Sequence, residues 1–324
     1  MMTGPRYNAL PTGERVDLFD REAGVEVRIL PAYGNRASAM RVKGTNILWF
    51  PPDDSAPITG KPSLNGIPFL APWGNRLSGG YRVNGRWYSL DGAELHRDAN
   101  GLPIHGLLYT PVKWTVSSLS ADAEAASVTS RFDFTAHPEM MALWPFPHEY
   151  EMTYRLTGGA LDVITVIRNR GAEAMPVAIG FHPYFHLSGV PREAISVRVP
   201  ARSHVETDAR LLATGAFTPN TLPEWAPLAS HALDDGFTDL IRDEEGRAAF
   251  VIGGGGKSIQ VAFGPRYTVA IVYAPPDQDF VCVEPMTAIT NGINLATERK
   301  YEGLQSVAPG GEWRESFRIS AEGF

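Results

Sequence analysis

Residues 148–171 read HEYEMTYRLTGGALDVITVIRNRG, and this stretch decides the fold class. Every second residue from Tyr150 to Leu156 is apolar, and the residues between them are polar or charged. Such a period of two predicts a β-strand with one buried face. The segment Thr157-Gly158-Gly159 can form a turn, and a run rich in β-branched residues follows it. The stretch therefore predicts an antiparallel hairpin.

Other parts of the chain repeat this pattern. Residues 81–90, YRVNGRWYSL, carry Asn84-Gly85, the strongest short signal of a hairpin turn. Residues 248–285 predict four strands in succession, and the last one ends at Glu284 because Pro285 stops it. The breaks between these strands are Gly253–Gly256, Gly264-Pro265 and Pro275-Pro276.

Long helical patterns are scarce, and the 32 glycines and 26 prolines are spread along the whole chain. We therefore expect an all-β fold built as a large antiparallel β-sandwich. No linker, low-complexity tract or internal repeat is visible. A single domain over residues 1–324 is the simplest prediction, although the length alone would also allow two domains.

Composition narrows the class of protein. The formal net charge is −7, which argues against a nucleic-acid partner or an anionic membrane surface, since both need a basic face. The single cysteine, Cys282, excludes an internal disulfide and a multi-cysteine metal site. No secretory signal and no apolar run of membrane-spanning length is visible. We expect a soluble cytoplasmic protein with no membrane partner.

Two motifs suggest ligands that the rest of the sequence does not support. Residues 253–258, GGGGKS, lack the first glycine of a phosphate loop, because that position is Val251, and a strand-like run follows instead of a helix. A hairpin turn is the better interpretation. His182 and His186 have a spacing that could bind a metal on a helix, but no glutamate or cysteine accompanies them, so we expect no metal.

Histidines and one carboxylate are the sharper candidates. His182 lies in GFHPYFHL, residues 180–187, and His105 lies in GLPIHGLLY, where flanking glycine and proline indicate a loop or strand edge. Each could be a core histidine or a functional one. Glu284 closes the apolar run FVCVE; it either faces water or is a poised carboxylate whose pKa burial raises.

Two further charged positions are less specific. Arg76 lies in PFLAPWGNRLSGG and is either a surface charge or a partly buried arginine with a polar partner. Asp234 and Asp235 precede a glycine, so a turn is the simplest interpretation of that pair.

Taken in order, these segments resemble the aldose 1-epimerase (galactose mutarotase-like) family. The resemblance extends over residues of about 20 to 320 and is carried by five segments: PFLAPWGNRLSGGYRVNGRWYSL, LPIHGLLY, GFHPYFHL, LDDGFTDL and VCVEPMTAITNGIN. It implies a β-supersandwich with an open cleft. It also implies an isomerase of carbohydrate metabolism that interconverts the α and β anomers of a hexose.

The resemblance implies roles for individual residues. Glu284 would be the general base that takes the proton of the C1 hydroxyl, and His182 the general acid that protonates the ring oxygen. The substrate-binding residues would be Asn75, Arg76, His105, Asp234 and Trp73. His186 could be a supporting or a core residue, and only position in the motif favours Asp234 over Asp235.

The residue types suit this chemistry. Ring opening moves one proton off an oxygen and another proton onto an oxygen, which a carboxylate and an imidazolium on opposite sides of the sugar can do at neutral pH. No electrons move and no group is transferred, so we expect no cofactor. Neutral sugars also need stacking partners, for which Trp73, Tyr184 and Phe185 are candidates, although core packing is an alternative for them.

Two other functions stay open. One is a hexose-6-phosphate 1-epimerase, which needs cations at the cleft mouth that Arg82, Arg86 or Arg97 could supply. The other is a non-catalytic sugar-binding protein, against which the presence of both Glu284 and His182 counts. The expected partner is a small-molecule sugar, and the expected assembly is a monomer or a weak homodimer.

Overall fold

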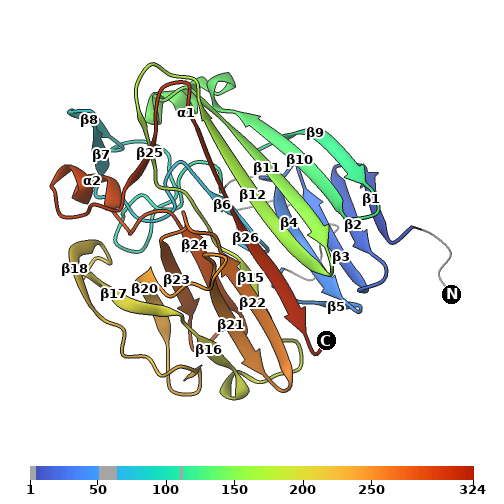
Figure 1. Ribbon diagram of the computed structural model, residues 1–324. Helices are drawn as coiled ribbons and strands as arrows, with labels where there is room; N and C mark the ends of the chain where they lie inside the picture. The colour runs from blue at the N-terminus through green and yellow to red at the C-terminus, as the bar shows by residue number, and fades with distance from the viewer. Residues whose placement is uncertain (1–4, 51–63, 110–111) are drawn as a thin grey trace.

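A computed structural model describes residues 5–50, 64–109 and 112–324. Antiparallel strands dominate it, as expected for an all-β fold (Figure 1). The first sheet is formed by five consecutive strands, β1 (Tyr7–Thr12), β2 (Arg15–Asp20), β3 (Val25–Leu30), β4 (Arg36–Val42) and β5 (Thr45–Asn46).

The largest sheet has nine strands, and distant parts of the chain meet in it. Its order is β19 (Ala226–Pro227), β16 (Ser196–Arg198), β21 (Ala248–Gly254), β22 (Lys257–Phe263), β26 (Glu312–Glu322), β12 (Ala160–Asn169), β11 (His148–Thr157), β10 (Ala126–Asp133) and β9 (Thr115–Ala121).

The third large sheet faces the nine-stranded one. Its order is β18 (Ala213–Pro219), β17 (Ala201–Thr207), β20 (Leu233–Leu240), β23 (Val269–Ala274), β24 (Val281–Met286), β14 (Gly180–Phe181) and β6 (Phe69–Leu70), and β15 (Tyr184–Phe185) also pairs with β24. Two small ribbons pair β13 (Met175–Val177) with β25 (Gln305–Val307) and β7 (Gly80–Val83) with β8 (Arg86–Ser89).

Helices are few and short in the described part of the chain. They are α1 (Pro138–Leu143), α2 (Gly292–Thr297) and the 3₁₀ turns Phe134–Ala136 and Arg192–Ala194. Figure 1 shows α2 beside the β7–β8 ribbon. None of the helices in the described ranges is long and apolar enough to cross a membrane.

The hairpins predicted from sequence are confirmed. β11 and β12 pair from His148 with Asn169 to Thr157 with Ala160, and Gly158 and Gly159 form the turn between them. β7 and β8 are joined by Asn84 and Gly85, which both have positive φ, as a tight two-residue hairpin turn requires.

The four strands predicted over residues 248–285 are also present, as β21 to β24, with one correction. The last strand continues through Pro285 to Met286 instead of ending at Glu284. Pro285 removes one amide donor, but pairing resumes at Met286, which lies opposite Val269 on one side and Gly180 on the other.

Aromatic side chains join the two large sheets. Phe181 of β14 contacts Phe317 of β26 with ring centroids 4.9 Å apart, and Phe69 of β6 contacts Tyr150 of β11 at 5.2 Å. The apolar residues of β11 predicted to share a face, from Tyr150 to Leu156, are all buried on this side. The sandwich therefore has a continuous apolar core between its sheets.

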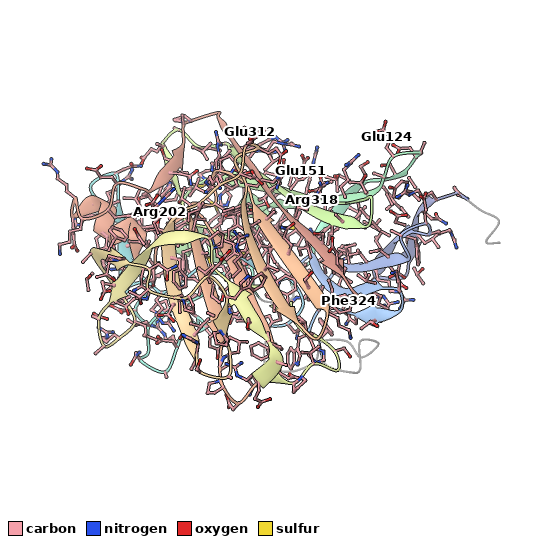
Figure 2. The ribbon with its side chains drawn as sticks, turned by 60° about the horizontal axis from the view of Figure 1, so that its bottom comes forward. Glu124, Glu151, Arg202, Glu312, Arg318 and Phe324 are labelled. Carbon is pink, nitrogen blue, oxygen red and sulfur yellow. The ribbon has the colours of Figure 1, made fainter. Side chains whose placement is uncertain are left out.

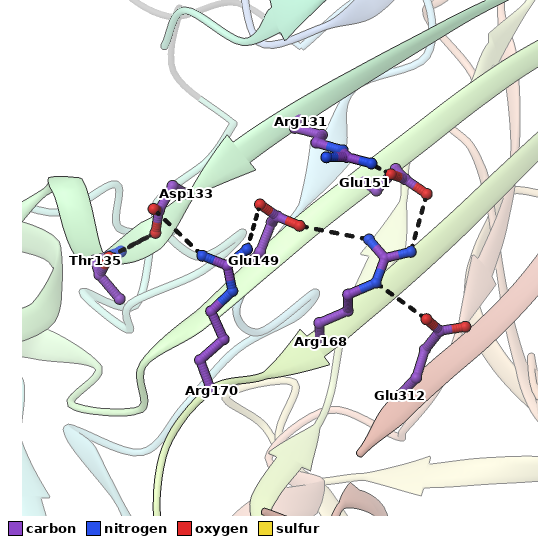
Figure 3. Close-up of polar contacts among 8 residues, drawn as sticks. All are labelled: Arg131, Asp133, Thr135, Glu149, Glu151, Arg168, Arg170 and Glu312. Atoms are coloured by element: carbon purple, nitrogen blue, oxygen red, sulfur yellow. Dashed lines mark hydrogen bonds and ion pairs between the residues drawn. The ribbon is translucent and has the colours of Figure 1, made fainter. Parts of the chain in front are cut away.

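The opposite face of the nine-stranded sheet is charged. Figure 2 labels Glu151, Glu312 and Arg318 among its side chains. Figure 3 shows how Arg168 of β12 bridges three carboxylates, those of Glu149, Glu151 and Glu312, at 3.1–3.4 Å. This ion-pair network lies on three neighbouring strands and does not contact the candidate site described below.

Candidate active site

A pocket of about 260 Å³ lies against strands β20, β23 and β24 of the third large sheet, which has eight strands. Strands β20, β23 and β24 supply one wall, the β14–β15 segment a second, and the loops around residues 75 and 96–105 the remainder. The residues that line it are Leu64, Asn75, Arg76, His96, Asp98, Ile104, His105, His182, Tyr184, Asp234, Ile271, Tyr273 and Glu284.

Glu284 and His182 touch at the bottom of this pocket. The Glu284 Oε1 atom lies 3.3 Å from the His182 Nε2 atom, and the two residues are 2% and 6% exposed. Glu284 is fixed in the middle of β24, opposite Ile271 of β23. The His182 ring lies flat on the Tyr184 ring at a centroid distance of 4.6 Å. The two groups are thus direct neighbours and lie within one sugar ring of each other.

Burial changes the proton affinity of both groups. It raises the pKa of Glu284 well above its ordinary value, and the charge of Asp234 adds to this while Arg76 opposes it. Burial lowers the pKa of His182 well below its ordinary value, and His105 adds to this. Both changes favour the neutral forms of Glu284 and His182.

His105 is held in a backbone conformation that few residues adopt. Its φ is +67°, and Gly106, with φ +68°, follows it. A side chain at Gly106 would collide with the Ala71 carbonyl oxygen, so only glycine allows the loop to approach this closely. His105 lies on a loop, as predicted, and such strain is common at functional sites.

The hydrogen bond of His105 fixes its tautomer. Its Nδ1 atom lies 3.2 Å from the Gly74 carbonyl oxygen, which can only accept, so Nδ1 carries the proton. Burial lowers the pKa of His105 to about 3. The ring is therefore neutral, and its Nε2 atom is a bare acceptor, suited to a hydroxyl group.

Arg76 has the polar partner that its apolar surroundings required. Its Nε atom donates to Asp98 Oδ2 at 2.7 Å, and its Nη1 atom donates to Asn75 Oδ1 at 3.3 Å. Asp98 also accepts from the backbone amides of Asn100 and Leu102, both at 2.9 Å. The guanidinium is thus held between two fixed oxygens and points one edge at the pocket.

The two adjacent aspartates separate, because successive residues of a strand point to opposite faces. Asp234 of β20 lines the pocket, where partial burial raises the pKa of its carboxyl. Asp235 accepts from His204 Nε2 at 2.9 Å and does not line the pocket. The geometry therefore favours Asp234 as the residue that can contact a ligand.

Four predicted positions need correction or placement. Trp73 is 1% exposed and packs against Tyr81 and Trp144, so it lies in the core and not in the pocket. Of the stacking candidates, Tyr184 lines the pocket and Phe185 is buried in the core. His186 is half-buried and pairs with Asp279 at 3.5 Å, away from the pocket lining.

Three polar residues of the pocket, His96, Asp98 and Tyr273, were not predicted from the sequence. His96 stacks on His105 at 5.7 Å, and burial lowers its pKa. Asp98 begins a turn, and the sequence DANG around it signals the turn correctly. No local signal shows that its carboxylate meets Arg76, which lies 22 positions earlier.

The arginines considered for a phosphate lie elsewhere. Arg86 pairs with Glu173, and Arg97 donates to the carbonyls of Leu90 and Gly101. Arg82 lines a different pocket. Among the described residues that line the pocket around Glu284 and His182, Arg76 is the single lysine or arginine.

Comparisons with known proteins agree with the fold. The family model for aldose 1-epimerase matches residues 20–320. The uncharacterised protein YihR of Escherichia coli is 30% identical over 141 residues, 43% of this chain and 42% of that protein. Human galactose mutarotase is 28% identical over 139 residues, 41% of this chain and 38% of that protein. The aligned part thus spans less than half the length of either relative.

A solved structure extends the likeness over the whole chain. A galactose mutarotase-like protein from Clostridium acetobutylicum superposes with a TM-score of 0.86 at 22% sequence identity, and 98% of each chain is covered. At this identity the match shows that the fold is shared: an all-β, galactose mutarotase-like sandwich.

Proposed function

We propose that this chain, which belongs to the aldose 1-epimerase family, interconverts the α and β anomers of a hexose by acid–base ring opening and reclosure. The observation that carries the proposal is the contact of 3.3 Å between Glu284 Oε1 and His182 Nε2 at the bottom of a polar pocket. It supplies a proton acceptor and a proton donor at one point, which is what ring opening requires.

The adjacency of the two groups fits the chemistry, because the C1 hydroxyl oxygen and the ring oxygen are bonded to the same carbon. In the proposed step, the Glu284 carboxylate takes the C1 hydroxyl proton while His182 Nε2 gives a proton to the ring oxygen. The bond between C1 and the ring oxygen breaks, and C1 becomes an aldehyde. Rotation about the C1–C2 bond and the reverse proton transfers yield the other anomer and restore both groups.

The pair needs one exchangeable proton for this cycle. With the proton on Glu284 the pair is neutral, and the pKa directions of both residues favour this resting form. Transfer of the proton to His182 produces the carboxylate and the imidazolium that the step uses. The pair therefore acts as a unit, and its two titrations belong to both residues together.

The remaining pocket residues would hold the sugar. Arg76 and the amide of Asn75 can donate to hydroxyl oxygens, and Asp234 can accept from hydroxyl groups. His105 would accept through its unprotonated Nε2 atom. The half-buried ring of Tyr273 would supply the apolar surface that a pyranose ring needs, since the Tyr184 ring is covered by His182.

The two alternatives have less support. A hexose 6-phosphate would bring a dianion to a pocket where Arg76 is already paired with Asp98. A binding protein without turnover would not need two buried ionisable groups in contact, since each costs free energy to bury. We therefore favour a neutral hexose as the substrate.

Polarimetry tests the proposal directly. Fresh α-D-glucose and α-D-galactose would be followed with wild type, with Glu284→Gln, with Asp235→Asn and without protein. Asp235→Asn is the matched control, because this carboxylate points away from the pocket. We expect wild type and the control to speed the decay of optical rotation, and Glu284→Gln to lose about 10²–10⁴ of that rate.

A different result would reject the proposal. If wild type follows the decay seen without protein on both sugars, the chain does not catalyse mutarotation of these hexoses. Glucose 6-phosphate would then be tested in the same assay. If Glu284→Gln keeps the wild-type rate, Glu284 is not the base.

A further inference from the structure

A second polar pocket, of about 280 Å³, is lined by residues of the β7–β8 ribbon and of α2. It is separate from the candidate active site, because the two share no lining residue. The residues that line it are Ser78, Arg82, Trp87, Asn291, Asn294, Thr297 and Glu298. From its composition and geometry we propose that this pocket binds a neutral pyranose unit of a saccharide.

The aromatic wall of this pocket is a rigid, open indole. Trp87 is 48% exposed, which is unusual for the largest apolar side chain. It is held in the ribbon opposite Arg82, and its ring lies against Gly80, where an added Cβ atom would come within 2.8 Å of it. The neighbouring Tyr88 stacks on the buried Tyr81 at 5.0 Å, which fixes the ribbon to the core. One face of the indole is therefore free to stack on a flat, weakly polar ligand.

The polar wall is held by its own hydrogen bonds. Asn294 accepts from the Arg82 amide and donates to the Gly80 carbonyl, so its side chain is fully used. The Asn291 Oδ1 atom accepts from the Ser78 amide and from Asn294 Nδ2. Within the described structure, this leaves the side-chain NH₂ of Asn291 without a partner, at a fixed position in the pocket.

The available groups can bind the hydroxyl groups of a sugar. Donors are present in Asn291 and Arg82, and acceptors in the Thr297 hydroxyl and the Glu298 carboxylate. Glu298 also pairs with Lys300 Nζ at 2.8 Å, so the preference for a neutral ligand rests on the exposed Trp87 face and the fixed Asn291 amide. An aromatic face combined with a few fixed donors and acceptors is the arrangement that orients small polar ligands, and the volume suits a single sugar ring.

The test observes the Trp87 indole directly in the intact protein. Protein labelled with ¹⁵N would be titrated with methyl α-D-glucopyranoside and with methyl β-D-galactopyranoside, whose locked anomeric centres cannot be turned over. The indole N–H resonance of Trp87 is assigned by its loss in Trp87→Phe. We expect this resonance to shift in a saturable manner with at least one glycoside, with a dissociation constant of about 1 mM.

Trp225 provides a matched internal control. It is 45% exposed and also lies against a glycine, Gly253, but it does not line this pocket. Its indole resonance should not move. The same titration on Glu284→Gln should still shift Trp87, which separates this proposal from the one for the active site.

Variants then measure the contribution of the ring, with the Asn291 side-chain amide as the reporter. Trp87→Ala should weaken binding about tenfold, and Trp87→Phe should weaken it less, because a smaller aromatic face remains. A Trp87 resonance that stays unmoved up to about 100 mM of both glycosides, 100 times the expected dissociation constant, would overturn the proposal. Equal movement of Trp225 would overturn it too, because the effect would then be non-specific.

Discussion

At the scale of single residues, the pocket side chains of the candidate site are fixed in place by contacts with neighbouring residues. Arg76 is fixed by Asp98, His105 by the Gly74 carbonyl, and the His182 ring by the Tyr184 face. Fixed donors and acceptors lose little conformational freedom when a ligand binds, which increases their contribution to affinity and rate. The supporting residues should therefore affect activity almost as much as the residues they support.

Asp98 is the sharpest case. Asp98→Asn keeps the turn but removes the charge that orients the Arg76 guanidinium, so we expect KM for the hexose to rise about tenfold while kcat changes less. Initial rates over a range of sugar concentrations measure this split. Asp122→Asn is the control, because Asp122 accepts from two backbone amides in a similar turn far from the pocket. Equal effects of the two variants would show that Asp98 acts through the turn alone.

The coupled pair makes a prediction about pH. Below its lower pKa the pair takes a second proton and has no base; above its upper pKa it loses its one exchangeable proton and has no acid. Burial lowers the pKa of His182 below its ordinary 6.5 and raises that of Glu284 well above 4.5. The acid step is therefore mainly the protonation of His182, and the alkaline step is mainly the loss of the Glu284 proton. We expect kcat/KM, corrected for the spontaneous reaction, to be level between an acid limb below pH 6.5 and a separate alkaline limb.

The alkaline limb is the informative one. It reports the loss of the last proton from the pair, which the proposed step needs on His182. If kcat/KM stays level throughout the alkaline range, Glu284 works as a base without a proton on His182, and the shared-proton mechanism is wrong.

At the scale of elements, the sequence predicts strands well and contacts between strands poorly. The alternation from Tyr150 to Leu156 is a local property, and the hairpin it predicts is present. Trp73 shows the limit: its neighbours Gly74, Asn75 and Arg76 mark a site segment, but its side chain packs between Tyr81 and Trp144. Which face a loop residue turns to the pocket depends on partners distant in the chain, and a single sequence does not reveal them.

The charged face of the nine-stranded sheet allows a quantitative prediction. Arg168→Met removes three ion pairs across β11, β12 and β26, so we expect the free energy of unfolding to fall by about 1 kcal/mol at low salt, since exposed pairs contribute little each. Arg155→Met is the control: Arg155 lies on the same face of β11 as Glu149 and Glu151 but is not a partner of Arg168. Urea unfolding at low salt and at about 1 M salt measures the stability of both variants. The difference in unfolding free energy between Arg168→Met and wild type should shrink at high salt.

At the scale of the whole molecule, length alone allows two domains, but the core argues for one. One cluster of buried apolar side chains extends from Tyr7 in the first strand to Ile319 in the last. It contains residues of the five-, eight- and nine-stranded sheets, so none of these sheets has a core of its own. We therefore propose that residues 1–324 form a single cooperative unit.

Calorimetry with two matched variants tests this unit. Val27 on β3 and Val261 on β22 are both fully buried, in different sheets. We expect one transition in wild type, with equal calorimetric and van't Hoff enthalpies. Val27→Ala and Val261→Ala should each lower that one Tm by about 2–8 °C, because either cavity weakens the shared core. If two transitions appear and each variant shifts only one of them, the five-stranded sheet folds as a domain of its own. In that case a continuous apolar core is not sufficient to make the five-stranded and nine-stranded sheets unfold together.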